Sequence, residues 1–203
     1  MSFQKWVVAK TDKTLARSLA EECGVDPLVA LLLTARGYTD PMDIEEFLSD
    51  DMPLSDPFDL PDMQAAVDRI ESALQKGESI AVYGDYDCDG VTSAALLTSY
   101  LTSKGAKAEA FLPERMTEGY GLHKTNIDAM KAQGFSLVLT VDNGVRAVEE
   151  IDYAASLGVD VVVTDHHIPG EELPRAVAVV DPHRVGCMAD YVDYAGVGVA
   201  FQL

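Results

Sequence analysis

Residues 79–90 read SIAVYGDYDCDG, a short apolar run followed at once by three aspartates at alternate positions and closed by a glycine. Segments with helical periodicity follow at residues 91–104, 123–133 and 145–157. Between and after these segments, further apolar runs resemble the first one, at residues 106–112, 136–141, 159–164 and 176–180. Strands that alternate with helices predict an α/β fold with a five-stranded, mostly parallel sheet and helices on both of its faces.

The first 61 residues lack this alternation. Apolar spacing predicts short helices at residues 12–23 and 27–36, and a third helix after Pro41. Residues 49–62 (SDDMPLSDPFDLPD) contain three prolines, which oppose regular structure. We therefore expect residues 1–61 to form a small helical extension with a proline-rich linker. Residues 62–203 would form the main domain, beginning with an amphipathic helix that ends at Gly77.

Composition excludes several classes of protein. The chain has 203 residues with 15 Lys and Arg against 34 Asp and Glu, a net charge of −19. This balance opposes binding of nucleic acid along a broad basic face, but it allows an enzyme that gathers carboxylates around cations. The three cysteines lack metal-binding spacing, and the longest apolar run, residues 28–33, is far shorter than a membrane span of about 20 residues. These features predict a cytoplasmic protein without a membrane partner.

Polar side chains follow each predicted strand. Because the carboxyl ends of parallel strands meet at one edge of a sheet, we expect these side chains to share one crevice, where ligands of such sheets bind. The second strand leads to Glu114 and Arg115 and then to a glycine-containing loop at residues 118–122. The other four strands contribute carboxylates and imidazoles, namely Asp85, Asp87, Asp89, Asp142, Asp165, His166, His167, Asp181 and His183.

Crowded carboxylates repel one another, so such a crevice needs either protons or cations. Oxygen and imidazole ligands without thiolates favour Mn²⁺ or Mg²⁺ over a structural zinc ion. The carboxylates outnumber the ligands that one ion uses. This excess suggests two ions about 3.5–4 Å apart, the usual arrangement for displacement at phosphorus.

Several of these residues have ordinary structural explanations when taken singly. Asp142 suits a helix N-cap, and His123 suits a helix start. Asp181 and His183 suit a turn, and a phospho-acceptor domain also keeps two or three aspartates at this edge. Such a domain has no use for adjacent histidines. Three alternating aspartates together with paired histidines on a sister strand therefore favour a metal site.

The segments GDYDCDG, LTVDNG, VTDHH and YAGVGVAF resemble the DHH phosphoesterase superfamily. Their order and spacing, from about residue 5 to the end, resemble its RecJ-like exonuclease family. The resemblance implies 5′→3′ hydrolysis of single-stranded DNA with Mn²⁺ or Mg²⁺, in recombination and repair. It also implies a helicase and a single-strand-binding protein as partners of the parent enzyme.

The resemblance assigns the metal ligands by position. Asp87 and Asp89 match a pair of ligands in the first motif. Asp142 matches the aspartate shared between two metals, and His166 matches a further ligand.

The remaining site residues are assigned to catalysis and substrate binding. His167 matches the histidine placed toward the phosphate, and its chemistry suits proton donation to the leaving oxygen. Asp85 and Asp165 are expected to orient the ligands, although Asp85 could also ligate directly. Arg115 is expected to contact a nucleotide phosphate.

The sequence also departs from the RecJ-like pattern. The family's fourth motif, an aspartate in a segment like GTIAD, and its second domain do not occur in the chain. We therefore expect a truncated catalytic domain from a longer enzyme, with weak or no activity by itself. The alternative is another DHH phosphoesterase acting on oligoribonucleotides, cyclic dinucleotides or pyrophosphate. Those members tend to have His where this chain has Tyr83. A non-catalytic scaffold is disfavoured, because the ligand residues are retained.

Overall fold

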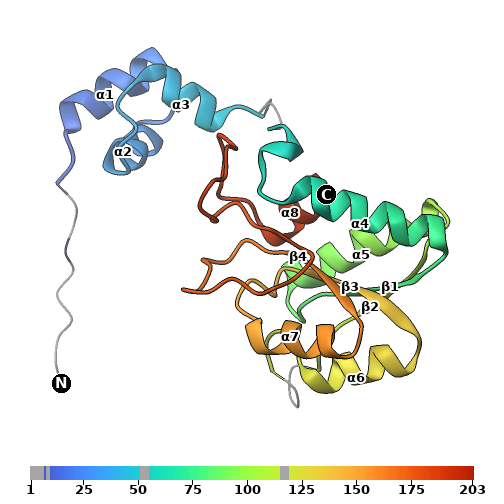
Figure 1. Cartoon of the computed structure of the whole chain (residues 1–203). Coiled ribbons are helices and arrows are strands. Elements are labelled where there is room, and N and C mark those ends of the chain that lie inside the picture. Colours follow the sequence, from blue (N-terminus) through green and yellow to red (C-terminus); the bar gives the residue numbers. More distant parts are fainter. Residues whose placement is uncertain (1–6, 8–9, 51–54, 115–118) are drawn as a thin grey trace, which may run out of the picture. The chain divides into compact units, whose positions relative to one another are not determined.

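The computed structural model describes residues 7, 10–50, 55–114 and 119–203 (Figure 1). The chain forms two compact units, residues 1–54 and residues 55–203. The first unit contains helices α1 (Lys13–Glu22), α2 (Pro27–Ala35) and α3 (Pro41–Leu48), as the apolar spacing predicts. An aspartate caps each of these helices, and a small core of Leu19, Leu33 and Ile44 joins them.

The second unit is built on a five-stranded sheet. Its strands are β1 (Ser79–Tyr83), β2 (Lys107–Phe111), β3 (Phe135–Val141), β4 (Asp160–Thr164) and β5 (Ala178–Val180). Their order is β2-β1-β3-β4-β5, and all four neighbouring pairs are parallel. The predicted fold class is therefore confirmed.

Helices cover both faces of this sheet, which buries its strands on both sides (Figure 1). One core lies beneath α4 (Met63–Lys76), α5 (Cys88–Ser103) and α8 (Gly196–Gln202) and includes Leu139. The opposite core lies beneath α6 (Lys124–Ala132) and α7 (Val148–Ser156) and includes Val138. Successive residues of β3 thus point to opposite faces. Within the described part of the chain, no helix has the length and apolarity to cross a membrane.

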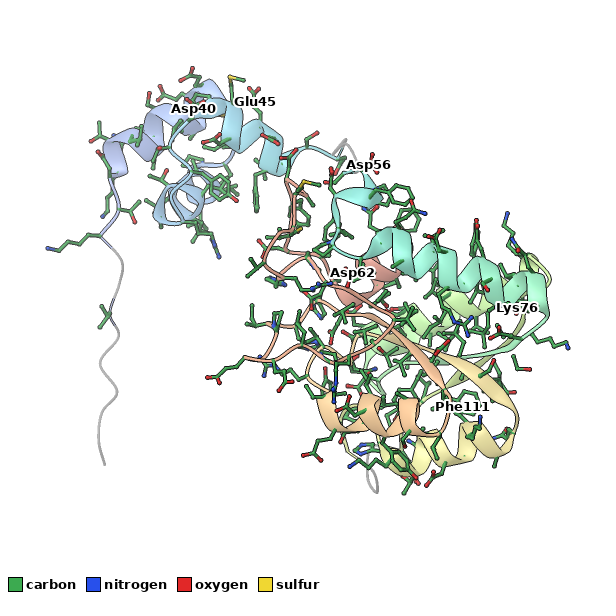
Figure 2. All side chains as sticks on the ribbon, viewed as in Figure 1. Asp40, Glu45, Asp56, Asp62, Lys76 and Phe111 are labelled. Carbon is green, nitrogen blue, oxygen red and sulfur yellow. The ribbon has the colours of Figure 1, made fainter. Side chains whose placement is uncertain are left out.

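The expectation that residues 49–62 lack regular structure is wrong at one point. Pro57–Asp59 form a short 3₁₀ helix, η1, because the Asp56 side chain accepts a hydrogen bond from Phe58 N at 2.9 Å and caps its start. Residues 55–61 also pack within the second unit. Leu60 is buried in the core beneath α4, and the Asp59 carbonyl accepts a hydrogen bond from Met188 N. Figure 2 labels Asp56 and Asp62, which lie before and after η1 in the chain.

Helix α5 begins three residues earlier than expected. The carboxylate of Asp87 accepts a hydrogen bond from Gly90 N at 2.9 Å, so it acts as the N-cap and the first turn starts at Cys88. Two of the three alternating aspartates therefore lie at the start of a helix that points its amide groups toward the carboxyl edge of the sheet.

We predict that Leu139→Ala lowers the free energy of unfolding by about 2–5 kcal/mol, because the side chain is fully buried in the central part of the sheet. The matched change Leu112→Ala, at a side chain that is 45% exposed, should cost under about 1 kcal/mol. Chemical denaturation followed by circular dichroism measures both. Equal losses would contradict this placement of the core.

Candidate metal centre

The loop after β1 folds tightly against the start of α5. A Cβ atom added at Gly90 would clash with the backbone of Asp85, at 2.4 Å from its N atom. Only glycine, which has no Cβ atom, fits at this position. Asp85 itself is 1% exposed, and its Oδ1 atom accepts a hydrogen bond from Tyr86 N at 2.6 Å. Asp87 is exposed, and Asp89 lies one position into the helix. The three alternating aspartates therefore differ in depth, with Asp85 innermost.

Asp142 follows β3 directly and has a left-handed backbone conformation, with φ of 60°. Its N–H group donates to the carbonyl of Thr164 at 3.1 Å, which extends the pairing with β4 by one residue. The side chain is only 2% exposed. Asp142 is not a helix N-cap, since α7 begins only at Val148. The positive φ, which aspartate tolerates better than most residues, turns the chain sharply at the end of the strand.

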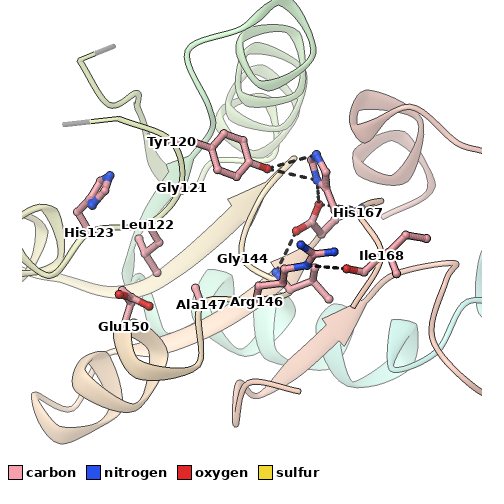
Figure 3. Close-up of a pocket in the computed structure, with 12 residues that line it drawn as sticks. Tyr120, Gly121, Leu122, His123, Gly144, Arg146, Ala147, Glu150, His167 and Ile168 are labelled. Atoms are coloured by element: carbon pink, nitrogen blue, oxygen red, sulfur yellow. Dashed lines mark hydrogen bonds and ion pairs between the residues drawn. The ribbon is translucent and has the colours of Figure 1, made fainter. Parts of the chain in front are cut away.

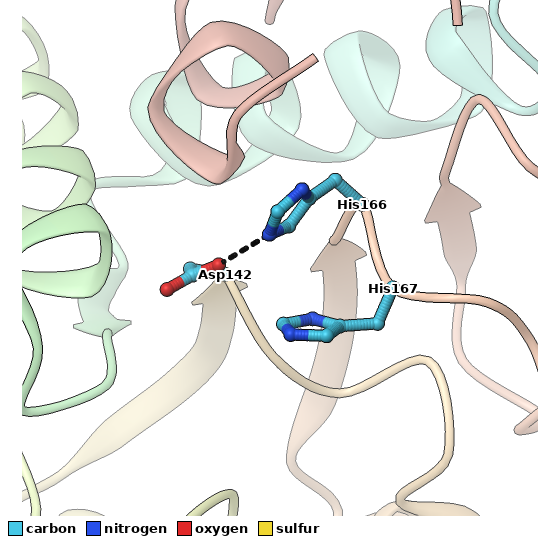
Figure 4. Close-up of side chains that lie close together, drawn as sticks. All are labelled: Asp142, His166 and His167. Carbon is cyan, nitrogen blue, oxygen red and sulfur yellow. Dashed lines mark ion pairs between the residues drawn. The ribbon is translucent and has the colours of Figure 1, made fainter. Parts of the chain in front are cut away.

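His166 faces Asp142 from the end of the neighbouring strand (Figure 4). Its Nδ1 atom lies 2.8 Å from the carbonyl oxygen of Tyr194. A carbonyl only accepts hydrogen bonds, so Nδ1 must carry the proton. In the neutral ring Nε2 then carries the lone pair. This Nε2 atom lies 3.0 Å from Asp142 Oδ1 and 3.7 Å from Asp89 Oδ2.

Two acceptor atoms that face each other at 3.0 Å require a proton or a cation between them. The pKa of Asp142 is raised to about 8. Burial is the main cause, followed by the charges of Asp89 and Asp87. Asp142 thus lies where an ionised carboxylate is unfavourable unless positive charge is added.

Asp165 holds the second histidine of the pair. Its Oδ1 atom lies 2.7 Å from Nδ1 of His167 and also accepts hydrogen bonds from the backbone N–H groups of His166 and His167. Its Oδ2 atom accepts from Val145 N at 2.9 Å. The hydrogen bond with Asp165 is the main cause that raises the pKa of His167. Asp165 therefore fixes the ring of His167 and favours its protonated form.

The geometry fits a divalent cation. A carboxylate oxygen of Asp142 and ring nitrogens of His166 and His167 lie within 4.8 Å of one another. The protonated form of His167, which Asp165 favours, has no lone pair for an ion, so Asp142 and His166 are the members of this group that could ligate. Asp89 lies beside this group, with Oδ2 toward His166. An imidazole lone pair together with carboxylate oxygens forms the donor set that Mn²⁺ and Mg²⁺ accept.

The other residues singled out by the sequence lie in different surroundings. Asp181 and His183 form a turn after β5, in which Asp181 Oδ1 accepts a hydrogen bond from His183 N at 2.7 Å. Burial raises the pKa of Asp181 to about 6. His123 immediately precedes α6. Arg115 lies outside the described residues.

A pocket of about 440 Å³ opens beside His167 (Figure 3). Tyr120 lines it, and its hydroxyl is 3.2 Å from the carbonyl of Asp142 and 3.3 Å from the His167 ring. Arg146 lines the pocket and donates from Nε to the carbonyl of Ile168 at 2.7 Å. Sequence reasoning missed Tyr120 and Arg146 as site residues. The loop at residues 118–122 was the signal for Tyr120, but nothing in the sequence marks Arg146.

The fold and site define a class of protein: a parallel α/β domain with a carboxylate and imidazole centre at the carboxyl edge of its sheet. Residues 79–203 match the model of the DHH family, N-terminal domain. The chain belongs to the DHH family.

The relatives are RecJ proteins. The chain is 42% identical over 203 residues to the single-stranded-DNA-specific exonuclease RecJ of Bacillus subtilis (strain 168), covering 100% of this chain and 26% of that protein. It therefore spans about a quarter of that relative's length.

Solved structures of RecJ are similar as well. A crystal structure of exonuclease RecJ bound to manganese matches with a TM-score of 0.62 and 36% identity, covering 74% of this chain and 37% of that one. RecJ from Thermus thermophilus in complex with Mn²⁺ matches with a TM-score of 0.65 and 28% identity, over 96% of this chain and 27% of that one. The Mg²⁺ complex of the same protein matches with a TM-score of 0.52 and 25% identity, over 96% and 23%.

We predict opposite effects of pH on stability and on metal binding. Asp142 has a folded pKa of about 8 against 3.8 for an ordinary Asp, so the folded protein holds an extra proton between these values. The Tm in EDTA should fall as pH rises from about 4 to about 8. Mn²⁺ must displace that proton, so its affinity should rise up to about tenfold per pH unit as pH approaches 8. Calorimetry measures both trends.

Asp142→Asn is the control for this prediction, because it keeps the size of the side chain and removes the titrating group. It should flatten much of the stability profile across this pH range and leave the contributions of Asp181 and His167, whose pKa values are also raised in the folded chain. A wild-type profile as flat as that of the variant would contradict the raised pKa of Asp142.

Proposed function

We propose that this chain is the metal-binding catalytic domain of a RecJ-like exonuclease that hydrolyses single-stranded DNA from its 5′ end with Mn²⁺ or Mg²⁺. The observation that supports it most directly is the facing pair of acceptors, Asp142 Oδ1 and His166 Nε2, at 3.0 Å. The similarity to RecJ over all 203 residues supports the choice of substrate.

In this proposal Asp142, His166, Asp87 and Asp89 hold the metal. A bound divalent ion lowers the pKa of water to produce hydroxide and stabilises negative charge on phosphoryl oxygens. Asp87 is exposed and Asp89 has an oxygen 3.7 Å from His166, so both can approach an ion from the β1 side of the crevice. We infer one ion held by this chain and a second ion in the complete enzyme, where further ligands would be available.

His167 suits the role of proton donor to the leaving oxygen. Asp165 lies at hydrogen-bond distance from its Nδ1 atom and raises the pKa of the ring, which favours the protonated form, while Nε2 lies 3.3 Å from the Tyr120 hydroxyl beside the pocket. The ring also lies within reach of the metal cluster. Asp165 acts as its positioning residue, and the buried Asp85 positions the loop that carries Asp87 and Asp89.

The pocket beside His167 is where we place the nucleotide that is released. Its wall combines the ring of Tyr120 with the apolar side chains of Leu122 and Ile168, which suits the face of a base. Arg146 adds a positive charge at the same wall. Arg115 would contact a phosphate of the bound strand.

The alternative function is that of a DHH phosphoesterase that acts on a small-molecule substrate. Tyr83 disfavours this alternative. Its hydroxyl donates to the carbonyl of Gly121 at 3.0 Å and accepts from Asn126 Nδ2 at 2.9 Å, and the side chain is 1% exposed. This position therefore supports the loop at residues 118–122 and provides no imidazole ligand.

Three wider inferences belong to the same proposal. The first is that, of residues 1–61, the helices α1 to α3 serve as an accessory extension to a DHH domain at residues 62–203, with residues 55–61 packed as part of that domain's unit. The second is that the enzyme acts in the cytoplasm, for which the unpaired cysteines are the support. The third, from the resemblance to RecJ-like exonucleases, is that a helicase supplies single strands and that a single-strand-binding protein accompanies them.

We predict that His166→Ala loses measurable Mn²⁺ binding, because it removes the ring nitrogen that lies 3.0 Å from Asp142 Oδ1. His183→Ala is the matched control. It should bind Mn²⁺ like the wild type, since His183 contacts the turn after β5 and not the cluster. Titration calorimetry measures both. Equal losses in the two variants would show that the metal site lies elsewhere.

The exonuclease activity is tested with 5′-labelled single-stranded DNA and Mn²⁺. We expect slow or no digestion by the 203-residue chain, and release of mononucleotides when the chain replaces the matching residues of the Bacillus subtilis RecJ. His167→Ala in that chimera should retain Mn²⁺ binding but lose about 10²–10⁴-fold in rate, with the acidic limb of the pH profile altered.

Asp142→Asn in the same chimera is the control and should abolish both binding and digestion. Cleavage of only dinucleotides or cyclic dinucleotides by the active chimera would favour the alternative substrates. Full activity of His167→Ala would contradict its role as proton donor.

A further inference from the structure

The segment at residues 194–197, which leads into α8, contacts two of the proposed ligands through hydrogen bonds. The Tyr194 carbonyl accepts the hydrogen bond from His166 Nδ1 at 2.8 Å. Gly196 N donates to Asp89 Oδ2 at 2.6 Å, and Val197 N donates to Asp89 Oδ1 at 2.8 Å. Every one of these contacts uses the backbone of the segment, so none depends on the identity of its side chains.

Gly196 also packs directly on a third proposed ligand, Asp142. A Cβ atom at this position would lie 2.5 Å from Asp142 Oδ1 and 2.7 Å from Asp142 Cβ. Asp142 is almost fully buried and comes directly after β3, so it has little room to move away. Glycine is therefore the residue that allows α8 to begin against the metal centre.

We propose that residues 194–197 are the positioning element of the metal centre, holding His166 and Asp89 in the orientation in which they bind the ion. This inference rests on the proposed function. It assigns a role to the YAGVGVAF segment, to which the proposed function gives none.

The physical reason is preorganisation. A free histidine exists in two tautomers, and a free carboxylate rotates, so both lose freedom when a metal binds. The Tyr194 carbonyl selects the tautomer of His166 whose Nε2 atom is a ligand. The two amides fix the plane of the Asp89 carboxylate while each of its oxygens keeps a second lone pair for the ion. Outer contacts of this kind typically contribute about 10–100-fold to metal affinity.

Two pairs of variants test the proposal by Mn²⁺ titration of the 203-residue chain. Val197→Pro removes one amide donor at a position in the first turn of α8, where proline is tolerated, and Val197→Ala keeps that amide. Gly196→Ala places a methyl group against Asp142. Gly198→Ala makes the same change two residues further on, where the three atoms nearest to the new methyl group all belong to the Tyr194 side chain, at 3.2 to 3.8 Å, and none to a proposed ligand.

We expect Val197→Pro and Gly196→Ala to weaken Mn²⁺ binding about tenfold or more, while Val197→Ala and Gly198→Ala bind like the wild type. The Tm in EDTA is recorded for all four variants. Equal Mn²⁺ affinity within either pair would overturn the proposal. So would losses of affinity that follow Tm in all four variants, because those losses would reflect the stability of α8 alone.

A metal-free measurement tests the histidine contact separately. Nitrogen NMR of the neutral His166 ring should show the proton on Nδ1 in the wild type, and a proton on Nε2 would overturn this part of the proposal. The outcomes also separate the two levels of inference. No Mn²⁺ uptake by the wild type would contradict the proposed function, whereas uptake that is insensitive to residues 196 and 197 would contradict only the positioning role.

Discussion

The site depends on one electrostatic constraint: a buried carboxylate oxygen faces an imidazole lone pair at 3.0 Å. Neither Asp142 nor His166 can turn away easily. Asp142 is fixed by its left-handed backbone and by Gly196 packed against it, and His166 is held by the Tyr194 carbonyl. Such an arrangement is unfavourable unless a proton or a cation lies between the two atoms, and in the proposed function a divalent ion takes the place of the proton.

The topology explains why the constraint arises at this point of the sheet. After β1 the chain crosses to β2 on one side, and it then returns to β3 on the other side of β1. The loops after β1 and β3 therefore diverge above neighbouring strands, which opens the crevice where ligands bind in sheets of this kind. Asp85, Asp87 and Asp89 follow β1, and Asp142 follows β3, so they meet at this switch point. The histidines come from β4, the next strand along.

Much of this architecture could be predicted from the sequence, because periodicity marks the strands and parallel pairing gathers their carboxyl ends. The facing of Asp142 and His166 follows from that rule. Other features could not be predicted. The acceptor for His166 is a backbone carbonyl 28 residues away, and Asp89 is held by backbone amides more than 100 residues away. Backbone groups are the same in every residue, so no sequence pattern marks them. The η1 turn was missed because proline was taken only as a breaker, whereas Pro57 is the first residue of η1, where proline and the Asp56 cap both favour a helical turn.

The strong negative charge of the chain is consistent with a nuclease only if the cation is part of substrate binding. A phosphate that approaches Asp87, Asp89 and Asp142 meets repulsion, which a divalent ion held by these residues would reverse at that point. The described basic residue at the adjacent pocket, Arg146, adds to that point and does not extend it along a strand. Attraction confined to one phosphate suits an enzyme that engages the end of a chain, whereas binding along many nucleotides requires a basic groove. Under the proposed function, the charges of the described residues therefore suit cleavage at a terminus better than cleavage within a strand.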